Sequence, residues 1–131
     1  MPDTVFLPDD RFYTSEHVWV KATDNLCVAG ISDFAQRRLE TVVFVDLPDP
    51  GKRFKAGDIF GNIESVKSVN AIYMPVSGTV LCVNEILEDV PERINTSPYE
   101  DGWLIRIQPD NHDDLLKLLN AMEYRNLLNV I

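Results

Sequence analysis

The chain has 131 residues, of which 45% are hydrophobic and 25% charged, and this length and composition are typical of one globular domain. No apolar stretch approaches the roughly 18 residues that cross a bilayer, and the N-terminus lacks the basic and apolar regions of a signal peptide, so we expect a cytoplasmic protein without membrane association. The 21 acidic and 12 basic residues give a net charge of −9, which disfavours nucleic acids as partners and favours basic protein surfaces.

Short apolar stretches alternate with turn residues over most of the chain, after an N-terminal segment without periodicity. Residues 1–10 are therefore predicted to form a mobile or surface-laid arm, followed by a single domain over residues 11–131. The spacing of the stretches is typical of antiparallel strands in a sandwich or barrel. The predicted strands cover residues 17–21, 26–31, 42–47, 58–63, 71–73, 79–83 and 103–107.

Two helical segments are predicted as accessories to this mainly β fold. Ser32 can cap a short helix that continues through Leu39, because an acid follows in the first turn and bases lie in the last. A C-terminal helix is predicted after Pro109, capped by Asp110 or Asn111, with a second short turn near its end. Its expected apolar face consists of Leu115, Leu118, Leu119 and Met122.

Motifs of enzymes and metal sites are absent from the sequence. Cys27 and Cys82 lie far apart in apolar runs, which predicts buried strand residues rather than a metal or redox site. The only histidines, His17 and His112, lie in unrelated segments, so a small hydrolase is a weak hypothesis, and we interpret His17 as a hydrogen-bonded structural residue. We therefore expect neither catalytic residues nor a metal.

The most informative segment runs from Asp58 to Tyr73. Apolar strand residues lie on both sides of positions 64–70, so Lys67 is predicted to lie at or near the tip of a hairpin. An exposed lysine on a rigid scaffold is accessible for covalent attachment of a long acyl arm. From geometry alone, an unmodified, solvated turn lysine remains the commoner alternative.

A series of short motifs extends from Arg11 to Leu128. They are YTSEHVW (13–19), VAGIS (28–32), FAQ (34–36), VFVDLP (43–48), ESVK (64–67), PVSG (75–78), VN (83–84), IN (94–95), SPY (97–99) and GW (102–103). In order and spacing this series resembles the H protein of the glycine cleavage system. The resemblance implies a flattened β barrel or sandwich of the biotinyl/lipoyl-carrier type, the barrel-sandwich hybrid.

The resemblance also implies a non-catalytic carrier with lipoic acid joined to Lys67 by an amide. Glu64, Ser65 and Val66 would flank the lysine for recognition by a lipoyl ligase or transferase. Biotin carriers have methionine on both sides of their lysine, whereas Val66 and Ser68 stand here, which favours lipoyl over biotinyl. The implied partners are the glycine cleavage P, T and L proteins, L being a dihydrolipoamide dehydrogenase, and the implied state is a monomer.

Two departures from the family pattern concern the cleft that receives the arm, for which the candidate residues are Glu16, His17, Val18, Asn70 and Ala71. In the family, acids at the positions of Val18 and Ala71 help to hold an arm loaded with an aminomethyl group. Their loss favours a cargo without positive charge. The H-like lipoate-binding proteins of cytoplasmic sulfur oxidation, which work with a heterodisulfide-reductase-like complex, fit this description.

Alternatives to that sulfur hypothesis remain open. The chain could be a glycine cleavage H protein in which Glu16 and Asn70 supply the lost polarity, or an unmodified H-like domain that serves as a binding module. A third departure places Glu40 and Thr41 where the family has glycine followed by an acid. The loss of that glycine predicts a different turn after the first helix.

Overall fold

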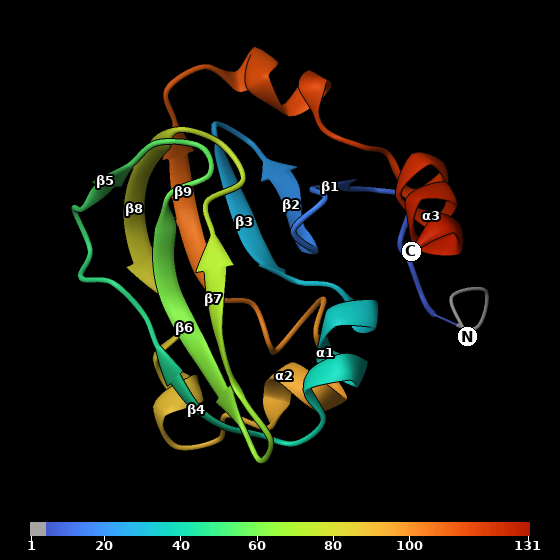
Figure 1. The fold of residues 1–131 in the computed structure, drawn as a ribbon. Coiled ribbons are helices and arrows are strands. Elements are labelled where there is room, and N and C mark those ends of the chain that lie inside the picture. The colour runs from blue at the N-terminus through green and yellow to red at the C-terminus, as the bar shows by residue number, and fades with distance from the viewer. Residues whose placement is uncertain (1–4) are drawn as a thin grey trace.

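The computed structural model describes residues 5–131, so residues 1–4 of the predicted arm lie outside the described residues. The chain forms two antiparallel sheets that face each other, with helices at the periphery (Figure 1). The six-stranded sheet has the order β1 (Phe12–Tyr13), β2 (Val18–Thr23), β3 (Leu26–Ile31), β9 (Ile105–Pro109), β8 (Gly78–Val83), β5 (Arg53–Phe54). The three-stranded sheet has the order β4 (Val42–Asp46), β6 (Ile59–Ser65), β7 (Val69–Tyr73). The predicted mainly β fold is confirmed.

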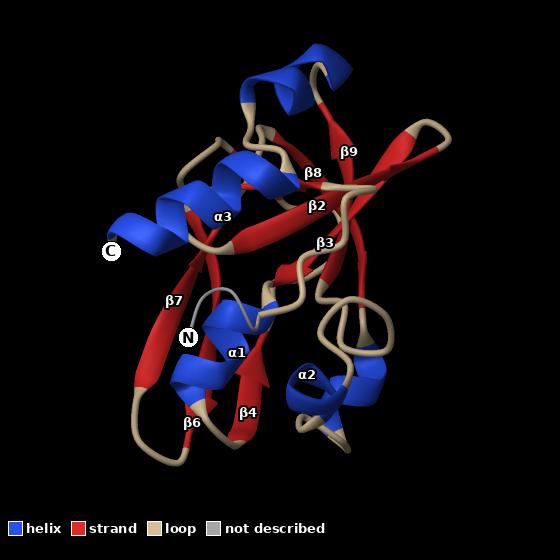
Figure 2. Ribbon diagram, turned by 90° about the vertical axis from the view of Figure 1, so that its right-hand side faces the viewer, coloured by secondary structure: helices blue, strands red, loops and turns tan. Residues whose placement is uncertain are grey.

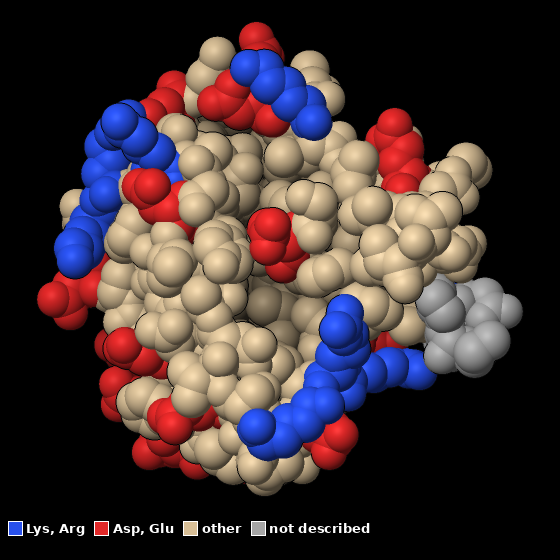
Figure 3. Space-filling view, in the orientation of Figure 1, with Lys and Arg blue, Asp and Glu red and all other residues tan. Residues whose placement is uncertain are grey.

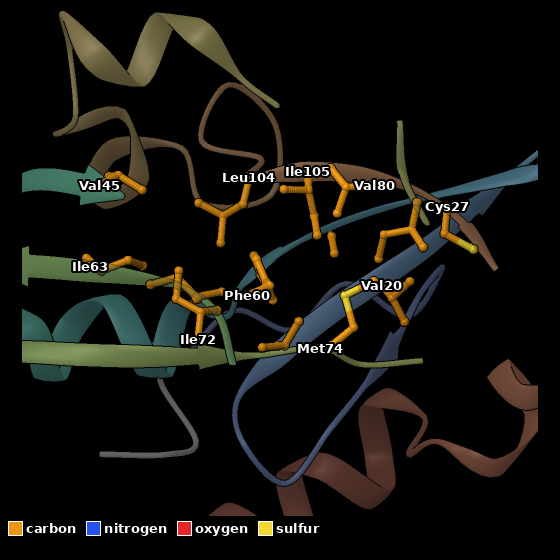
Figure 4. Close-up of a cluster of buried hydrophobic side chains, with 14 of the residues drawn as sticks. Val20, Cys27, Val45, Phe60, Ile63, Ile72, Met74, Val80, Leu104 and Ile105 are labelled. Carbon is orange, nitrogen blue, oxygen red and sulfur yellow. The ribbon is translucent and has the colours of Figure 1, made fainter. Parts of the chain in front are cut away.

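The main core lies between the two sheets, and strand alternation explains how it forms. In β9, Ile105 and Ile107 are buried while Arg106 and Gln108 are exposed, as expected for a strand with one face toward the core. Figure 4 shows side chains of the smaller sheet pointing toward those of the larger one, among them Phe60, Ile63, Ile72, Val20, Val80 and Ile105. This packing fixes β6 and β7, which carry the segment from Glu64 to Asn70.

Helix α1 (Asp33–Leu39) agrees with the sequence prediction, since the Ser32 hydroxyl accepts a hydrogen bond from the backbone N–H of Ala35 at 3.2 Å. Two short elements, the 3-10 helix η2 (Glu85–Glu88) and α2 (Arg93–Thr96), were not predicted. Each has four residues, too few to show a helical hydrophobic period. Helices α1 and α2 lie at the end of the molecule where β6 and β7 turn (Figure 2).

A C-terminal helix is confirmed, but the prediction that it begins directly after Pro109 is wrong. The segment forms a 3-10 helix, η3 (His112–Lys117), with Asn111 as N-cap, and then α3 (Ala121–Val130). Between them, the backbone N–H and C=O of Leu119 bond to Tyr13 at 2.9 and 2.8 Å, which holds this stretch extended. Asn120 then begins α3 with a capping box, and Met122 is 75% exposed.

A second apolar cluster joins the two ends of the described chain. Val5 and Leu7 are buried against Tyr124 and Leu128 of α3, together with Tyr13, Trp19 and Tyr99. The backbone N–H of Phe6 also donates to Asp33 Oδ2 at 3.0 Å. The described part of the predicted arm, residues 5–10, therefore packs against the surface of the domain. Among residues 5–131, no helix has the length and apolarity required to cross a membrane.

Candidate functional site

The hairpin of β6 and β7 presents Lys67 at its tip, as the sequence predicts. Ser65 is buried, and its hydroxyl accepts hydrogen bonds from the backbone N–H groups of Lys67 at 3.3 Å and Ser68 at 3.2 Å. The backbone N–H of Ser65 donates to the carbonyl of Ser68 at 2.8 Å, which closes the turn. The Lys67 side chain is 52% exposed. A rigid turn thus carries an accessible amine.

A cavity of about 470 Å³ opens beside this lysine, and a hollow is visible on the corresponding face in Figure 3. Its walls come from the turn before β2, the end of β3, helix α1, β6 and β7. The residues that line it are Glu16, His17, Ile31, Ala35, Arg38, Leu39, Ile63, Lys67, Ser68, Asn70, Ala71, Ile72 and Tyr73. The structure therefore brings together Lys67 and four of the five candidate cleft residues.

Val18 is the candidate that the structure places elsewhere. It is the first residue of β2, it is 1% exposed, and it packs in the main core rather than lining the cavity. The prediction that Val18 lies in the cleft is therefore wrong, because a side chain at this position changes the core rather than the cleft surface. In this structure, Ala71 is a part of the cavity wall and Val18 is not.

Charge is distributed unevenly around the cavity. In the part of the chain that the structure describes, Glu16 is the only carboxylate that lines it, whereas Arg38 and Lys67 supply positive charge. Ile31, Ile63 and Ile72 are buried apolar residues of the same wall. A cavity with an apolar wall and a few charged groups fits a long, mainly aliphatic chain that ends in a polar group.

His17 is fixed in the cavity wall by the C-terminal helix. Its Nδ1 lies 2.7 Å from the hydroxyl of Tyr124, which also bonds to the Ser32 hydroxyl at 2.8 Å. The Phe34 ring lies 5.0 Å from the imidazole, measured between ring centroids. These contacts support the interpretation of His17 as a hydrogen-bonded structural residue. The contribution of Tyr124 and Arg38 could not be found from sequence, because neither lies in a motif near the lysine.

The pKa of His17 is held below its ordinary value of 6.5 by burial and by the positive charge of Arg38. A neutral imidazole is therefore favoured in the folded protein, so the unfolded chain binds a proton first as the pH falls. We expect unfolding free energy to decrease as the pH falls below about 6.5, and urea titrations of His17→Asn between pH 7.5 and 5 to show a flatter dependence. The exposed His112→Asn variant is the control, and an equal flattening there would contradict this assignment.

The turn after the first helix, which the loss of the family's glycine predicts to be different, has an unusual backbone conformation at Glu40. Glu40 has φ 64° and ψ −149°, a region that glycine adopts readily and other residues rarely do. Its backbone N–H donates to the carbonyl of Gln36 at 3.1 Å and ends α1. The glutamate thus adopts a conformation typical of glycine.

The cysteines differ in their surroundings. Cys27 is fully buried, as predicted, and burial raises the pKa of its thiol. Cys82 is only partly buried, contrary to the prediction, and its Sγ lies 3.8 Å from a guanidinium nitrogen of Arg106. Within residues 5–131, no three His, Cys, Asp or Glu side chains are grouped so that they could hold a metal ion.

Comparisons of sequence and of structure with known proteins identify the same protein family. The family model described as Glycine cleavage H-protein matches residues 11–131. The glycine cleavage system H protein of Listeria monocytogenes is 48% identical over 123 residues, which cover 94% of this chain and 98% of that protein. The Oceanobacillus iheyensis H protein is 49% identical over 118 residues, covering 90% and 94% respectively.

A solved structure agrees with these sequence matches. The crystal structure of a glycine cleavage system H protein from Mycobacterium marinum matches this chain with a TM-score of 0.86 and 36% identity. The match covers 95% of this chain and 100% of that one. Lys67 and every residue that lines the cavity lie within the range that the family model matches.

Proposed function

Because the chain belongs to the glycine cleavage H-protein family, a family of non-catalytic lipoyl carriers, we propose that it serves a glycine cleavage system with its lipoyl group on Lys67. The observation that carries this proposal is the position of Lys67, which ends the ESVK motif on an exposed, rigid hairpin tip beside a cavity. Acylation there would cost little, because the tip already projects into solvent and needs no rearrangement of the core.

The residues around the tip suit a covalent lipoyl group. When bound, that group supplies a dithiolane that accepts a one-carbon amine and can be reoxidised by a flavoprotein. Ser65 keeps the turn closed, and the partly buried lining residues Ala35, Leu39 and Ala71 provide apolar surface against which aliphatic carbons can pack. Tethering raises the local concentration of the arm at each docked enzyme. The proposed partners are the P, T and L proteins and the lipoyl ligase or transferase that loads Lys67.

The relatives support glycine cleavage over the sulfur-oxidation hypothesis that the sequence favoured. The relatives described above, from Listeria monocytogenes, Oceanobacillus iheyensis and Mycobacterium marinum, are named as glycine cleavage system H proteins. The sulfur hypothesis depended on Val18 and Ala71, and the Val18 side chain lies in the core outside the cavity. Glycine cleavage is therefore favoured over sulfur oxidation as the pathway that this carrier serves. The ESVK motif at the tip matches the family pattern, which likewise argues against an unmodified binding module.

Glu16 is the proposed binding residue for a cationic cargo, since within residues 5–131 it supplies the only carboxylate that lines the cavity. Glu16 is exposed, so the loss of one ion pair there corresponds to about 0.4–1 kcal/mol, or roughly two- to fivefold. Glu16→Gln is expected to lower the rate of glycine–bicarbonate exchange about two- to fivefold at subsaturating carrier, without changing the extent of lipoylation. Glu100→Gln, an exposed acid outside the cavity, is the matched control. Equal rates for the two variants would exclude this role.

The experiment that tests the proposed function uses the loaded protein. The chain is lipoylated with a lipoyl ligase, loading is verified by intact mass on the same sample, and glycine–bicarbonate exchange is measured with a glycine decarboxylase. Exchange comparable to that of the Listeria H protein is expected. Fully loaded protein that supports no exchange would reject glycine cleavage while leaving a lipoyl carrier of another pathway.

A further inference from the structure

The corner between α1 and β4 contains a backbone conformation that needs an explanation. Glu40 has a positive φ of 64° combined with a ψ of −149°. A positive φ also occurs at Gly51 and Gly57 and at two non-glycine residues, His17 and Asp24. A non-glycine residue in this region is strained, and such strain is found most often where a residue has a function.

Asn95 of α2 holds this corner in place through its side-chain amide. Its Nδ2 donates to the carbonyl of Glu40 at 2.6 Å and to Gln36 Oε1 at 3.2 Å. Its Oδ1 accepts from the backbone N–H of Val42 at 2.8 Å. One side chain therefore bonds the end of α1 and the start of β4 on both sides of Glu40, which keeps the backbone in its strained conformation.

The same corner contacts the hairpin tip at two points. The carbonyl of Thr41 accepts a hydrogen bond from the backbone N–H of Val66 at 3.0 Å. The Glu40 carboxylate lies 3.4 Å from Lys67 Nζ, with the two side chains 62% and 52% exposed. The strained residue thus directs its carboxylate to the lysine at which the lipoyl group is proposed to be attached.

We propose that Glu40 is a positioning residue that holds the unmodified Lys67 amine against this corner and so competes with the enzyme that acylates it. The inference rests on the proposed function only in taking Lys67 as the site of acylation. To react, the side chain must leave the corner and extend into the active site of the acylating enzyme. The ion pair stabilises the state before that step and is lost during it.

The charge balance of acylation explains why the contact exists only before modification. A bond forms between Lys67 Nζ and the acyl carbon of an activated lipoyl ester or anhydride, and the bond from that carbon to its leaving group breaks. The ammonium releases two protons in total, and the amide that remains is neutral. Glu40 then has no cation to pair with, and the arm is free to leave the corner.

Lipoylation kinetics test this inference. An exposed ion pair is weak, so Glu40→Gln is expected to raise kcat/KM for a lipoyl ligase about two- to fivefold at low ionic strength, and the gain should shrink at about 0.5 M salt. Glu88→Gln makes the same change in net charge at an exposed site on η2 and should show no gain. An unchanged or lower kcat/KM for Glu40→Gln, or an equal gain for Glu88→Gln, would overturn the proposal.

Two further variants separate positioning from a structural effect. Glu40→Gly removes both the carboxylate and the strain, so it should match the kinetic gain of Glu40→Gln but also raise Tm, whereas Glu40→Gln keeps the strain. A double-mutant cycle with Lys67→Met needs no ligase and should give a coupling of about 1.5- to fivefold in the unfolding equilibrium constant. Zero coupling between Glu40 and Lys67 would overturn the proposal. If the two residues are coupled but no ligase modifies the chain, only the proposed function is rejected.

Discussion

Lys67→Arg is expected to abolish lipoylation and all carrier activity while the free energy of unfolding changes by less than about 0.5 kcal/mol. Arginine keeps the positive charge and the reach of the side chain, so it can still pair with Glu40. Its guanidinium stays protonated at any relevant pH and does not act as an amine nucleophile. Because the Lys67 side chain is 52% exposed at a turn, the exchange disturbs no packing.

Intact mass after incubation with a lipoyl ligase measures the first part of this prediction, and urea denaturation measures the second. Lys55→Arg is the matched control, since Lys55 is also exposed but lies in the turn before β6 rather than at the tip. It should become fully lipoylated. A lipoyl group found by peptide mapping on another lysine of the Lys67→Arg variant would refute the assignment of the attachment site.

Gly61→Ala is expected to destabilise the fold by about 3 kcal/mol, near the upper end for an added methyl group in a packed site. A Cβ at Gly61 would lie 2.3 Å from the backbone carbonyl oxygen of Asp46, in the neighbouring strand β4. The backbone of a paired strand cannot move to relieve this clash, whereas a flexible side chain could. The sheet would have to separate beside the strand that leads to Ser65 and Lys67, so loading should also slow.

Thermal unfolding measures this effect, and a decrease in Tm of roughly 10 °C is expected for a chain of this size. Gly51→Ala makes the same chemical change where no atom lies within 4 Å of the new Cβ. Its cost comes only from the φ of 94° and should be about 1 kcal/mol. Equal losses for both variants would mean that the approach of β4 to Gly61 is not what requires glycine there.

Seven of the nine strands within residues 5–131 could be predicted from sequence, because burial on one face leaves a period of two residues, as in β9. Strands β1 and β5 could not, since each has only two residues. The short helices α2 and η2 could not be predicted, because they depend on packing against neighbouring elements rather than on a sequence pattern of their own. The C-terminal segment had an apolar period over Leu115 to Met122, but the pairing of Leu119 with Tyr13 prevailed over it. The capping residues Asn120 and Glu123 were the signal that could have located the true start of α3.

The lysine could be located from sequence because strands flank it on both sides, whereas the cavity could be assigned only in part. Val18 was misplaced because it begins a strand, where adjacent side chains point to opposite faces, and its side chain is the one directed into the core. Arg38 reaches the cavity from α1 and Tyr124 supports its wall from α3. These contacts join segments far apart in the chain, and no local pattern encodes them.

The hydrogen bond between His17 and Tyr124 spans 107 positions, and this separation has a consequence for the order in which the protein matures. The ribosome delivers the hairpin with Lys67 long before it delivers α3. The hairpin and the strands around it can pair as soon as β9 has emerged, but the imidazole in the cavity wall acquires its partner only after Tyr124 has been translated. One hydrogen bond in the wall of the cavity, that of His17 Nδ1, can therefore form only after almost the whole chain has been translated.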